Sequence, residues 1–147
     1  MELAPGLVHE QSLRVTPELT VPHVNPALTH FADMPPVFAT AFLVAFVEDT
    51  CIAALRPYLT EGQHSVGTHV DLSHTAATPP GMTVTARVEL VAVEGRRLVF
   101  QVECHDGRES IGGGRHERSL IDLKRFDAKV AAKAANLPPQ ATPGEAT

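Results

Sequence analysis

The clearest pattern along the chain is a nearly continuous apolar segment that follows two prolines. Residues 37–47 are apolar at all but one position, and Pro35-Pro36 come directly before them. Proline suits the first turn of a helix, whereas the Arg56-Pro57 pair ends one. A helix that is apolar on nearly every side is a buried helix. The pattern therefore predicts one helix over residues 37–55, wrapped by a sheet or held in an interface.

Alternating apolar and polar positions predict strands on both sides of this helix. One interrupted strand covers residues 7–21, and the strands after the helix cover residues 65–75, 82–93, 97–105 and 109–123. Asp106-Gly107 is a hairpin signal, and the run of three glycines at 112–114 predicts a bulge. An antiparallel sheet wrapped around one long central helix is an α+β arrangement, the hot dog fold. Sheet and helix cannot cover each other fully in so short a chain, which favours a homodimer.

The remaining segments predict a single domain over residues 1–135. Residues 22–35 contain three prolines and no clear period, which indicates a long loop, interpreted as a lid. Residues 124–135 fit a surface helix. Residues 136–147 contain three further prolines and few apolar side chains, so we expect a disordered tail.

Composition narrows the functional classes. The 147 residues carry a net charge of -5, which argues against a nucleic-acid binder with a basic stripe. Cys51 and Cys104 match neither a disulfide framework nor a zinc site, and the eight histidines show no metal-ligand spacing, so we expect no metal. The longest apolar run, 41–47, is too short to cross a bilayer, and we see no secretory signal. We therefore expect a cytoplasmic protein without membrane or nucleic-acid partners.

Three polar residues interrupt apolar elements and are candidates for chemistry. Glu48 lies in the apolar helix, where a buried carboxylate without a partner is costly. The alternative is that Glu48 marks where the helix reaches solvent. Thr40 lies in the same helix and could simply bond a carbonyl one turn back. His74 shares a strand face with aliphatic Val70 and Leu72, either as a core histidine or as a proton carrier.

Several stretches resemble the fluoroacetyl-coenzyme A thioesterase family. They are PVFAT (36–40), HTAATPPG (74–81), VEGRR (93–97), HDG (105–107) and HER (116–118), at matching spacing from Glu48. The similarity covers about residues 13–130. It implies a dimeric hot dog enzyme that hydrolyses acyl-coenzyme A (acyl-CoA) thioesters without metal or other cofactor, coenzyme A being part of the substrate.

The resemblance also implies roles for individual residues. Thr40, Glu48 and His74 correspond to the family's catalytic set, and Gly67 and Arg118 to its substrate contacts. In the lid, Phe31 matches a family phenylalanine, whereas Met34 replaces a second one. Methionine lacks a rigid aromatic face, so we expect the family's selectivity for a fluorinated acyl group to be weaker here.

For this reaction we expect the Gly67 N–H to bind the oxyanion and Glu48 to act as base or nucleophile. His74 carries the proton, and Thr40 orients water or the carbonyl. The coenzyme A phosphates are expected to meet basic residues, with four candidates: Arg96, Arg97, Arg115 and Lys124. Two alternatives remain open, a hot dog dehydratase acting on hydroxyacyl thioesters and a non-catalytic acyl-thioester binder.

Helix geometry limits how the catalytic set assembles. Thr40 and Glu48 are eight residues apart, which separates their Cα atoms by roughly 12 Å along a helix. Their side chains cannot bridge that gap with a direct hydrogen bond. Either both act along one extended substrate, or one site takes Thr40 and Glu48 from different subunits, which is the arrangement we favour.

Overall fold

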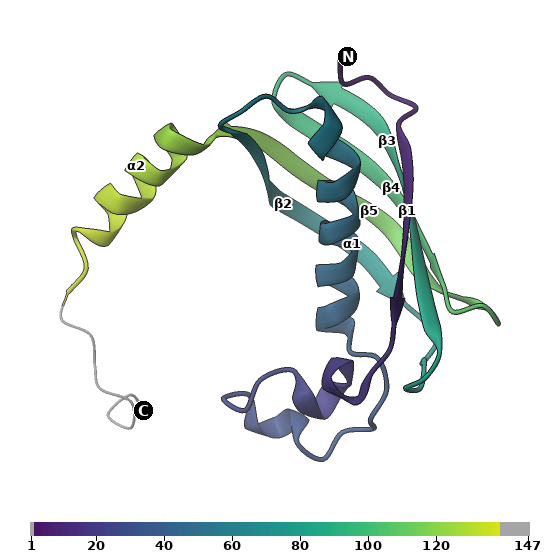
Figure 1. Ribbon diagram of the computed structural model, residues 1–147. Helices are drawn as coiled ribbons and strands as arrows, with labels where there is room; N and C mark the ends of the chain where they lie inside the picture. Colours follow the sequence, from purple (N-terminus) through teal and green to yellow (C-terminus); the bar gives the residue numbers. More distant parts are fainter. Residues whose placement is uncertain (1, 139–147) are drawn as a thin grey trace.

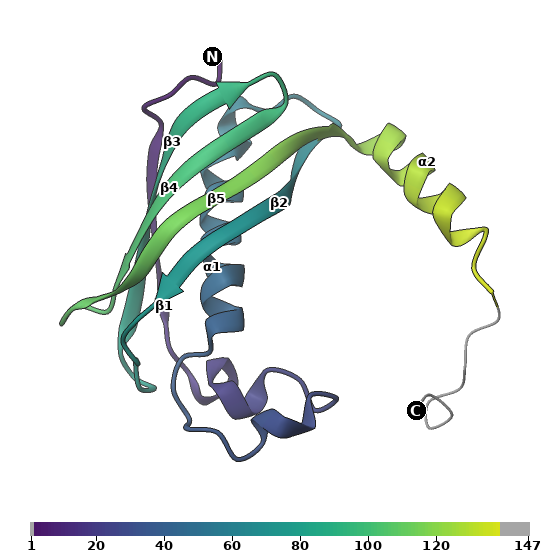
Figure 2. The same ribbon diagram turned by 180° about the vertical axis from the view of Figure 1, so that it is seen from behind.

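A five-stranded antiparallel sheet curves around helix α1 (Thr40–Leu55) in the computed structural model, which describes residues 2–138 (Figure 1). The strands are β1 (Val8–Arg14), β2 (Gln63–His74), β3 (Thr83–Glu94), β4 (Arg97–His105) and β5 (Ser110–Asp122). Their order across the sheet is β1-β3-β4-β5-β2. Seen from behind, the sheet lies in front of α1 (Figure 2). The predicted α+β hot dog fold, one sheet around one long helix, is confirmed.

The core lies between α1 and the concave face of the sheet. Alternation along β3 and β4 places every second side chain there, as expected from the sequence. The fully buried members of these two strands include Val84, Ala86, Val88, Leu90, Leu98 and Phe100. From the helix, Leu43, Val47, Cys51 and Leu55 complete the packing.

The sheet covers only one side of α1. Ala41 and Ala45 are exposed, and Val44 is only partly buried, on the side of the helix away from the core. The expectation of a helix buried nearly all round is therefore not met within one chain. An apolar helix face that one chain leaves open is suited to contact with another surface.

Helix α1 begins three residues later than predicted. Residues 37 and 38 stay outside the helix. The Val37 N–H closes a tight bend by donating to Pro35 O, and the Phe38 N–H donates to Thr78 O, at 2.9 Å each. Phe38 also bridges to Thr20 in an antiparallel manner. The first strand likewise ends early, at Arg14, because Pro17 opens a short 3-10 helix, Pro17–Leu19.

Strand β2 does not join the meander formed by β3, β4 and β5. It pairs with β5 at the edge of the sheet, and its register shifts between Gly67 and His69. The bulge predicted at glycines 112–114 is displaced, since the register between β4 and β5 shifts between Cys104 and His105. The glycines instead permit close backbone approach: a Cβ on Gly112 would lie 2.0 Å from Ser73 O.

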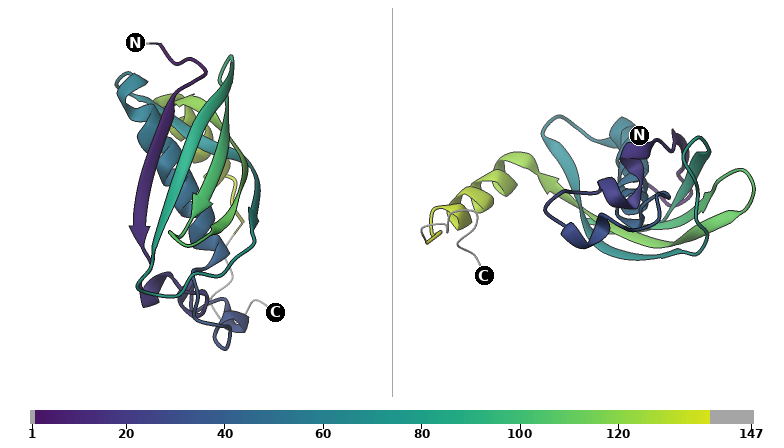
Figure 3. Two further views of the ribbon diagram at one scale, coloured as in Figure 1. Left: turned by 90° about the vertical axis from the view of Figure 1, so that its right-hand side faces the viewer. Right: turned by 90° about the horizontal axis from the view of Figure 1, so that it is seen from below.

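The predicted lid is compact and lies below the N-terminal end of α1 (Figures 1 and 3). It contains two short 3-10 helices, Val21–His23 and Thr29–Phe31. At the other end of the molecule, α2 (Leu123–Ala134) continues from β5 and projects away from the sheet (Figure 3). Asp122 caps it by accepting a hydrogen bond from the Arg125 N–H at 3.0 Å.

Two sequence-based expectations concern the ends and the membrane. Most of the tail predicted over residues 136–147 lies outside the described residues. Within the described part of the chain, no helix is both long enough and apolar enough to span a membrane.

Candidate active site

The first polar cluster joins the start of α1 to the end of β2. Thr40 is the first residue of α1 and His74 the last of β2, and Thr40 Oγ1 lies 2.8 Å from His74 Nδ1. The Phe38 ring meets the imidazole edge-on, with 6.2 Å between ring centroids. Burial lowers the pKa of His74, which favours the neutral ring at neutral pH. The sequence-predicted pair is therefore in direct contact.

The second ring nitrogen of His74 is buried without a partner. Among the described residues, His74 Nε2 is the one buried side-chain nitrogen or oxygen that lacks a hydrogen bond. A buried polar atom left unsatisfied is costly, so it calls for an explanation such as a catalytic role or a bound water or ion. Thr40 thus fixes one nitrogen of this imidazole, while the other is buried without a partner among the described residues.

Backbone contacts hold this cluster in place. Gly112 lies opposite His74 in the sheet and lets the two strands approach closely. The following loop is anchored by Thr78, whose hydroxyl donates to Asp106 Oδ2 at 3.0 Å and whose carbonyl accepts from Phe38 N–H. The same loop therefore fixes both the segment after His74 and the segment before Thr40.

The second polar cluster lies near the middle of α1. Arg118, on β5, donates from Nη1 to Glu48 Oε2 at 2.9 Å. The Arg118 side chain is only 3% exposed, whereas that of Glu48 is 38% exposed. A buried guanidinium requires a counter-charge, and Glu48 supplies it. The carboxylate is consequently held in place by the arginine while part of it remains accessible.

Two further residues complete the surroundings of Arg118. Ser65 accepts from Arg118 Nε through Oγ at 2.8 Å and from Nη2 through its carbonyl at 3.0 Å. His116 Nε2 lies 3.1 Å from Arg118 Nη1. The guanidinium is thus bonded on three sides, which fixes the direction from which it meets Glu48.

The tautomer of His116 follows from its two partners. Its Nδ1 lies 2.8 Å from His69 O, and a carbonyl can only accept, so Nδ1 carries the proton. Its Nε2 must then accept from Arg118. Burial is the main cause that lowers the pKa of His116, and the Arg118 charge lowers it further. His116 is therefore neutral, and its 4.0 Å separation from Glu48 Oε2 is not an ion pair.

Gly67 makes room for the carboxylate. A Cβ at this position would lie 2.5 Å from Glu48 Oε2, so any side chain here would displace Glu48 or the strand. The sequence-based expectation was that this glycine lets backbone approach a substrate. In the structure, the group that uses the space is Glu48 of the same chain, which lies directly against the β2 backbone.

The structure thus divides the predicted site residues into two clusters. Thr40 and His74 form one, Glu48, Gly67 and Arg118 form the other, and no direct Thr40–Glu48 hydrogen bond occurs within the described residues. In the lid, Phe31 is half-buried and Met34 is 47% exposed.

Sequence reasoning assigned no role to His116 or Ser65. The signal for both was available. His116 lies two positions before Arg118 and so shares its strand face, whereas Ser65 lies two positions before Gly67 on the neighbouring strand.

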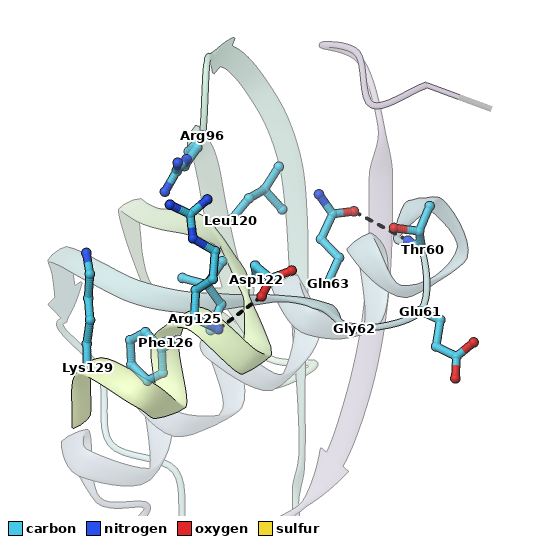
Figure 4. Close-up of a pocket in the computed structure, with 11 residues that line it drawn as sticks. Thr60, Glu61, Gly62, Gln63, Arg96, Leu120, Asp122, Arg125, Phe126 and Lys129 are labelled. Carbon is cyan, nitrogen blue, oxygen red and sulfur yellow. Dashed lines mark hydrogen bonds between the residues drawn. The ribbon is translucent and has the colours of Figure 1, made fainter. Parts of the chain in front are cut away.

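A hollow of about 420 Å³ lies away from both clusters, lined by α2, the end of β5 and the segment before β2 (Figure 4).

Comparisons with known proteins agree with this architecture. The family described as fluoroacetyl-CoA-specific thioesterase matches residues 15–124. The fluoroacetyl-CoA thioesterase of Streptantibioticus cattleyicolor is 51% identical over 119 residues, which cover 81% of this chain and 86% of that protein.

Solved structures give the same picture. A structure of a fluoroacetyl-CoA thioesterase superposes with a TM-score of 0.88 at 45% identity, covering 94% of this chain and 100% of the other. A variant of such an enzyme in complex with fluoroacetate and CoA gives 0.82 at 47% identity, over 84% and 99%. A thioesterase superfamily member from Thermus thermophilus gives 0.80 at 27% identity, over 90% and 93%.

Proposed function

Because this chain belongs to the fluoroacetyl-CoA-specific thioesterase family, we propose that it hydrolyses small acyl-CoA thioesters at the two polar clusters around α1. It is a thioester hydrolase, with water and an acyl-CoA as substrates. One observation supports the assignment of the site: buried Arg118 holds the Glu48 carboxylate against Gly67, and part of this carboxylate remains accessible.

Glu48 is the group that begins the reaction. Its carboxylate either attacks the thioester carbonyl to form a mixed anhydride or removes a proton from the attacking water. In both cases negative charge develops on the carbonyl oxygen, and the Gly67 N–H beside Glu48 is the proposed donor to it. Arg118 acts as a positioning residue, because its donors are directed to Glu48, Ser65 and His116.

His74 and Thr40 serve the departing thiolate. The sulfur leaves with the electron pair of the broken C–S bond and needs a proton. If the Thr40 hydroxyl donates to Nδ1, then Nε2 carries the proton of the neutral imidazole and can pass it to sulfur. Thr40 thereby sets the tautomer of His74, as an orienting group does in other acid–base pairs.

We further propose a homodimer in which the two clusters come from different subunits. Its support is the apolar side of α1 that the sheet leaves uncovered, together with the edge position of β2, which within residues 2–138 pairs only with β5. An unpaired strand edge is a template for pairing with another chain. Both surfaces border the proposed site.

Mixing inactive subunits tests the shared site. Thr40→Ala and Glu48→Gln chains, each inactive alone, should regain activity when subunits exchange, because one site in the mixed dimer receives both native residues. The matched control places both substitutions on one chain paired with wild type. If exchange is demonstrated by mass spectrometry and no activity returns, both clusters act within one chain.

The activity itself is tested by thiol release. A screen over acetyl, fluoroacetyl, branched and aromatic acyl-CoA esters should give free CoA with the small acyl groups, and Glu48→Gln protein should release none. Absence of thiol release from every ester would contradict the proposed function.

We also propose a cytoplasmic location. Cys51 and Cys104 are free and buried, and burial raises the pKa of their thiols to about 12 and about 11. Free thiols suit a reducing compartment.

A further inference from the structure

The hollow beside α2 gathers positive charge. Arg96 lies in the turn between β3 and β4, and Arg125 and Lys129 lie one turn apart on α2. Figure 4 shows their charged ends on the same side of the hollow. Among the described residues, none of these three cations forms an ion pair. Three cations that converge without an ion-pair partner repel one another, which favours binding of an anion.

Within residues 2–138, the two acidic residues that line the hollow, Glu61 and Asp122, form no ion pair with these cations. Asp122 uses Oδ1 to cap α2 through the Arg125 N–H, and Figure 4 shows the Glu61 carboxylate directed away, on the opposite side from Arg125. The aromatic ring of Phe126 also lines the hollow. Aromatic faces stack on nucleobases while cationic side chains bind phosphates, so the lining suits a phosphorylated nucleoside. A volume of about 420 Å³ lies in the range of small-molecule sites.

The hollow lies at a fitting distance from the proposed site. Gln63, which lines it, and Gly67 are on the same strand and the same face, four residues apart. At the rise of a strand this is roughly 13 Å. The pantetheine arm of coenzyme A has about thirteen bonds from sulfur to the first phosphorus, which spans roughly 14–16 Å at the reach of an extended chain. Both positions are in one chain, so the match holds whichever subunit supplies Thr40.

We propose that this hollow binds the 3′-phospho-ADP portion of the acyl-CoA substrate. Arg96, Arg125 and Lys129 contact its phosphates, and Phe126 packs against adenine. The inference rests on the proposed function, because it assumes that the thioester carbonyl lies at Gly67.

The proposal also distinguishes among the four basic residues that the sequence suggested as contacts for the coenzyme A phosphates. Arg97 pairs with Glu94 and Glu117, and Arg115 pairs with Glu117 on the face of the sheet away from α1. Only Arg96 of the four lines the hollow.

Direct binding tests the hollow without turnover. Calorimetric titration of the full-length protein with adenosine 3′,5′-bisphosphate should show binding that Arg125→Glu weakens roughly tenfold or more. Lys133→Glu is the matched control, because Lys133 is exposed on the same helix but outside the hollow, and it should bind like wild type. ADP and inorganic phosphate should bind more weakly than the bisphosphate.

Steady-state kinetics test whether the hollow contributes to binding of the acyl-CoA substrate. With acetyl-CoA, Arg125→Glu should raise KM roughly tenfold and leave kcat nearly unchanged, because the charge change is remote from the reacting atoms. With acetyl-pantetheine, which lacks the nucleotide, the variant and wild type should have equal kcat/KM.

Each result decides one question. Equal bisphosphate binding by wild type and Arg125→Glu, or equal KM of the two for acetyl-CoA, overturns the nucleotide site and leaves the hydrolase intact. If no acyl-CoA is hydrolysed but bisphosphate binding is lost in Arg125→Glu, the hollow is a nucleotide site and the proposed function is wrong.

Discussion

Thr40 and His74 meet through one hydrogen bond between neutral groups, whereas Glu48 belongs to a network around a buried guanidinium. In the first cluster, strand ends and a loop hold the side chains, and one ring nitrogen stays without a partner. In the second, Arg118 is bonded to Ser65, His116 and Glu48. The first cluster thus presents a neutral imidazole with one unpaired nitrogen among the described residues, and the second holds a negative charge in a fixed place.

This difference predicts different consequences of substitution. A substitution at the first cluster removes a reactive side chain, but other residues keep the surrounding backbone in place. A change at the second also disturbs the pairing of a buried cation, and a buried charge that loses a partner costs stability. Activity and stability should therefore separate at the first cluster and fall together at the second.

The largest effect is expected for Glu48→Gln. It removes the proposed base or nucleophile while keeping the shape, so kcat for acetyl-CoA should fall by about 10³-fold or more. The matched control is Asp49→Asn, because Asp49 is the exposed neighbour that bonds Gln11. Near-native turnover by Glu48→Gln protein would show that the charge in the second cluster is structural.

His74→Ala should reduce kcat by about 10²-fold, since a positioned proton carrier contributes on that order. Its melting temperature should stay close to that of wild type, because Gly112 and the Thr78 loop hold the strand end without the imidazole. The control is His64→Ala, which removes an exposed histidine from the same strand. If His74→Ala instead unfolds the protein and spares turnover, the imidazole is a core residue.

His116→Leu tests the second cluster through stability. It removes the donor to His69 O and the acceptor for one N–H of Arg118 Nη1, whose other N–H still donates to Glu48, so we expect a loss of about 1–3 kcal/mol in the free energy of unfolding. Urea denaturation measures it, with exposed His64→Leu as control. Unchanged stability together with reduced turnover would instead place His116 among the reacting groups.

The same histidine predicts a pH dependence. Because the pKa of His116 is lowered in the folded protein, the unfolded chain binds more protons below the ordinary histidine pKa. Its contribution therefore makes stability fall as the pH drops from about 7 toward 5. His74 adds to this loss in the same direction. The fall should be smaller in His116→Leu protein, measured by urea denaturation across that range; an equal fall in both proteins contradicts it.

Periodicity alone predicted most of the fold but not the order of its strands. The strand starting at residue 83 was placed within one residue because its apolar face is buried at every second position. The edge position of β2 was missed, because pairing with distant β5 depends on tertiary contacts that alternation does not encode. The helix start was also missed, since bonds to distant residues keep both positions outside the helix: the Phe38 N–H donates to Thr78 O, and Val37 O accepts from the Val21 N–H.

For the candidate site, the sequence identified isolated residues but not their partners. Thr40, Glu48 and His74 were noticed as polar residues in apolar elements, and the family resemblance assigned their roles. Their partners depend on how β2 and β5 lie along α1. This packing brings Arg118 to Glu48 and His74 to Thr40. His116 was overlooked because a histidine between charged residues of a strand looks like a solvated one until its neighbours are placed.

The smallest effect is expected in the lid, which lies at the same end of α1 as the first cluster (Figure 3). Met34 is 47% exposed and its side chain is flexible, so it offers no fixed surface against a fluorine-sized group. The ratio of kcat/KM for fluoroacetyl-CoA to that for acetyl-CoA should therefore be lower than in relatives with an aromatic residue at this position.

Met34→Phe should raise that ratio several-fold, since discrimination between substrates that differ by so little rests on about 1 kcal/mol of differential contact. Met34→Leu is the matched control, because it changes the side chain without adding a ring, and it should leave the ratio unchanged. Neither substitution touches the second cluster, so kcat/KM for acetyl-CoA should change little in both variants. A strong fluoroacetyl preference in the unmodified protein would show that selectivity does not depend on this lid residue, and the cause would then lie in the surroundings of Thr40 and His74.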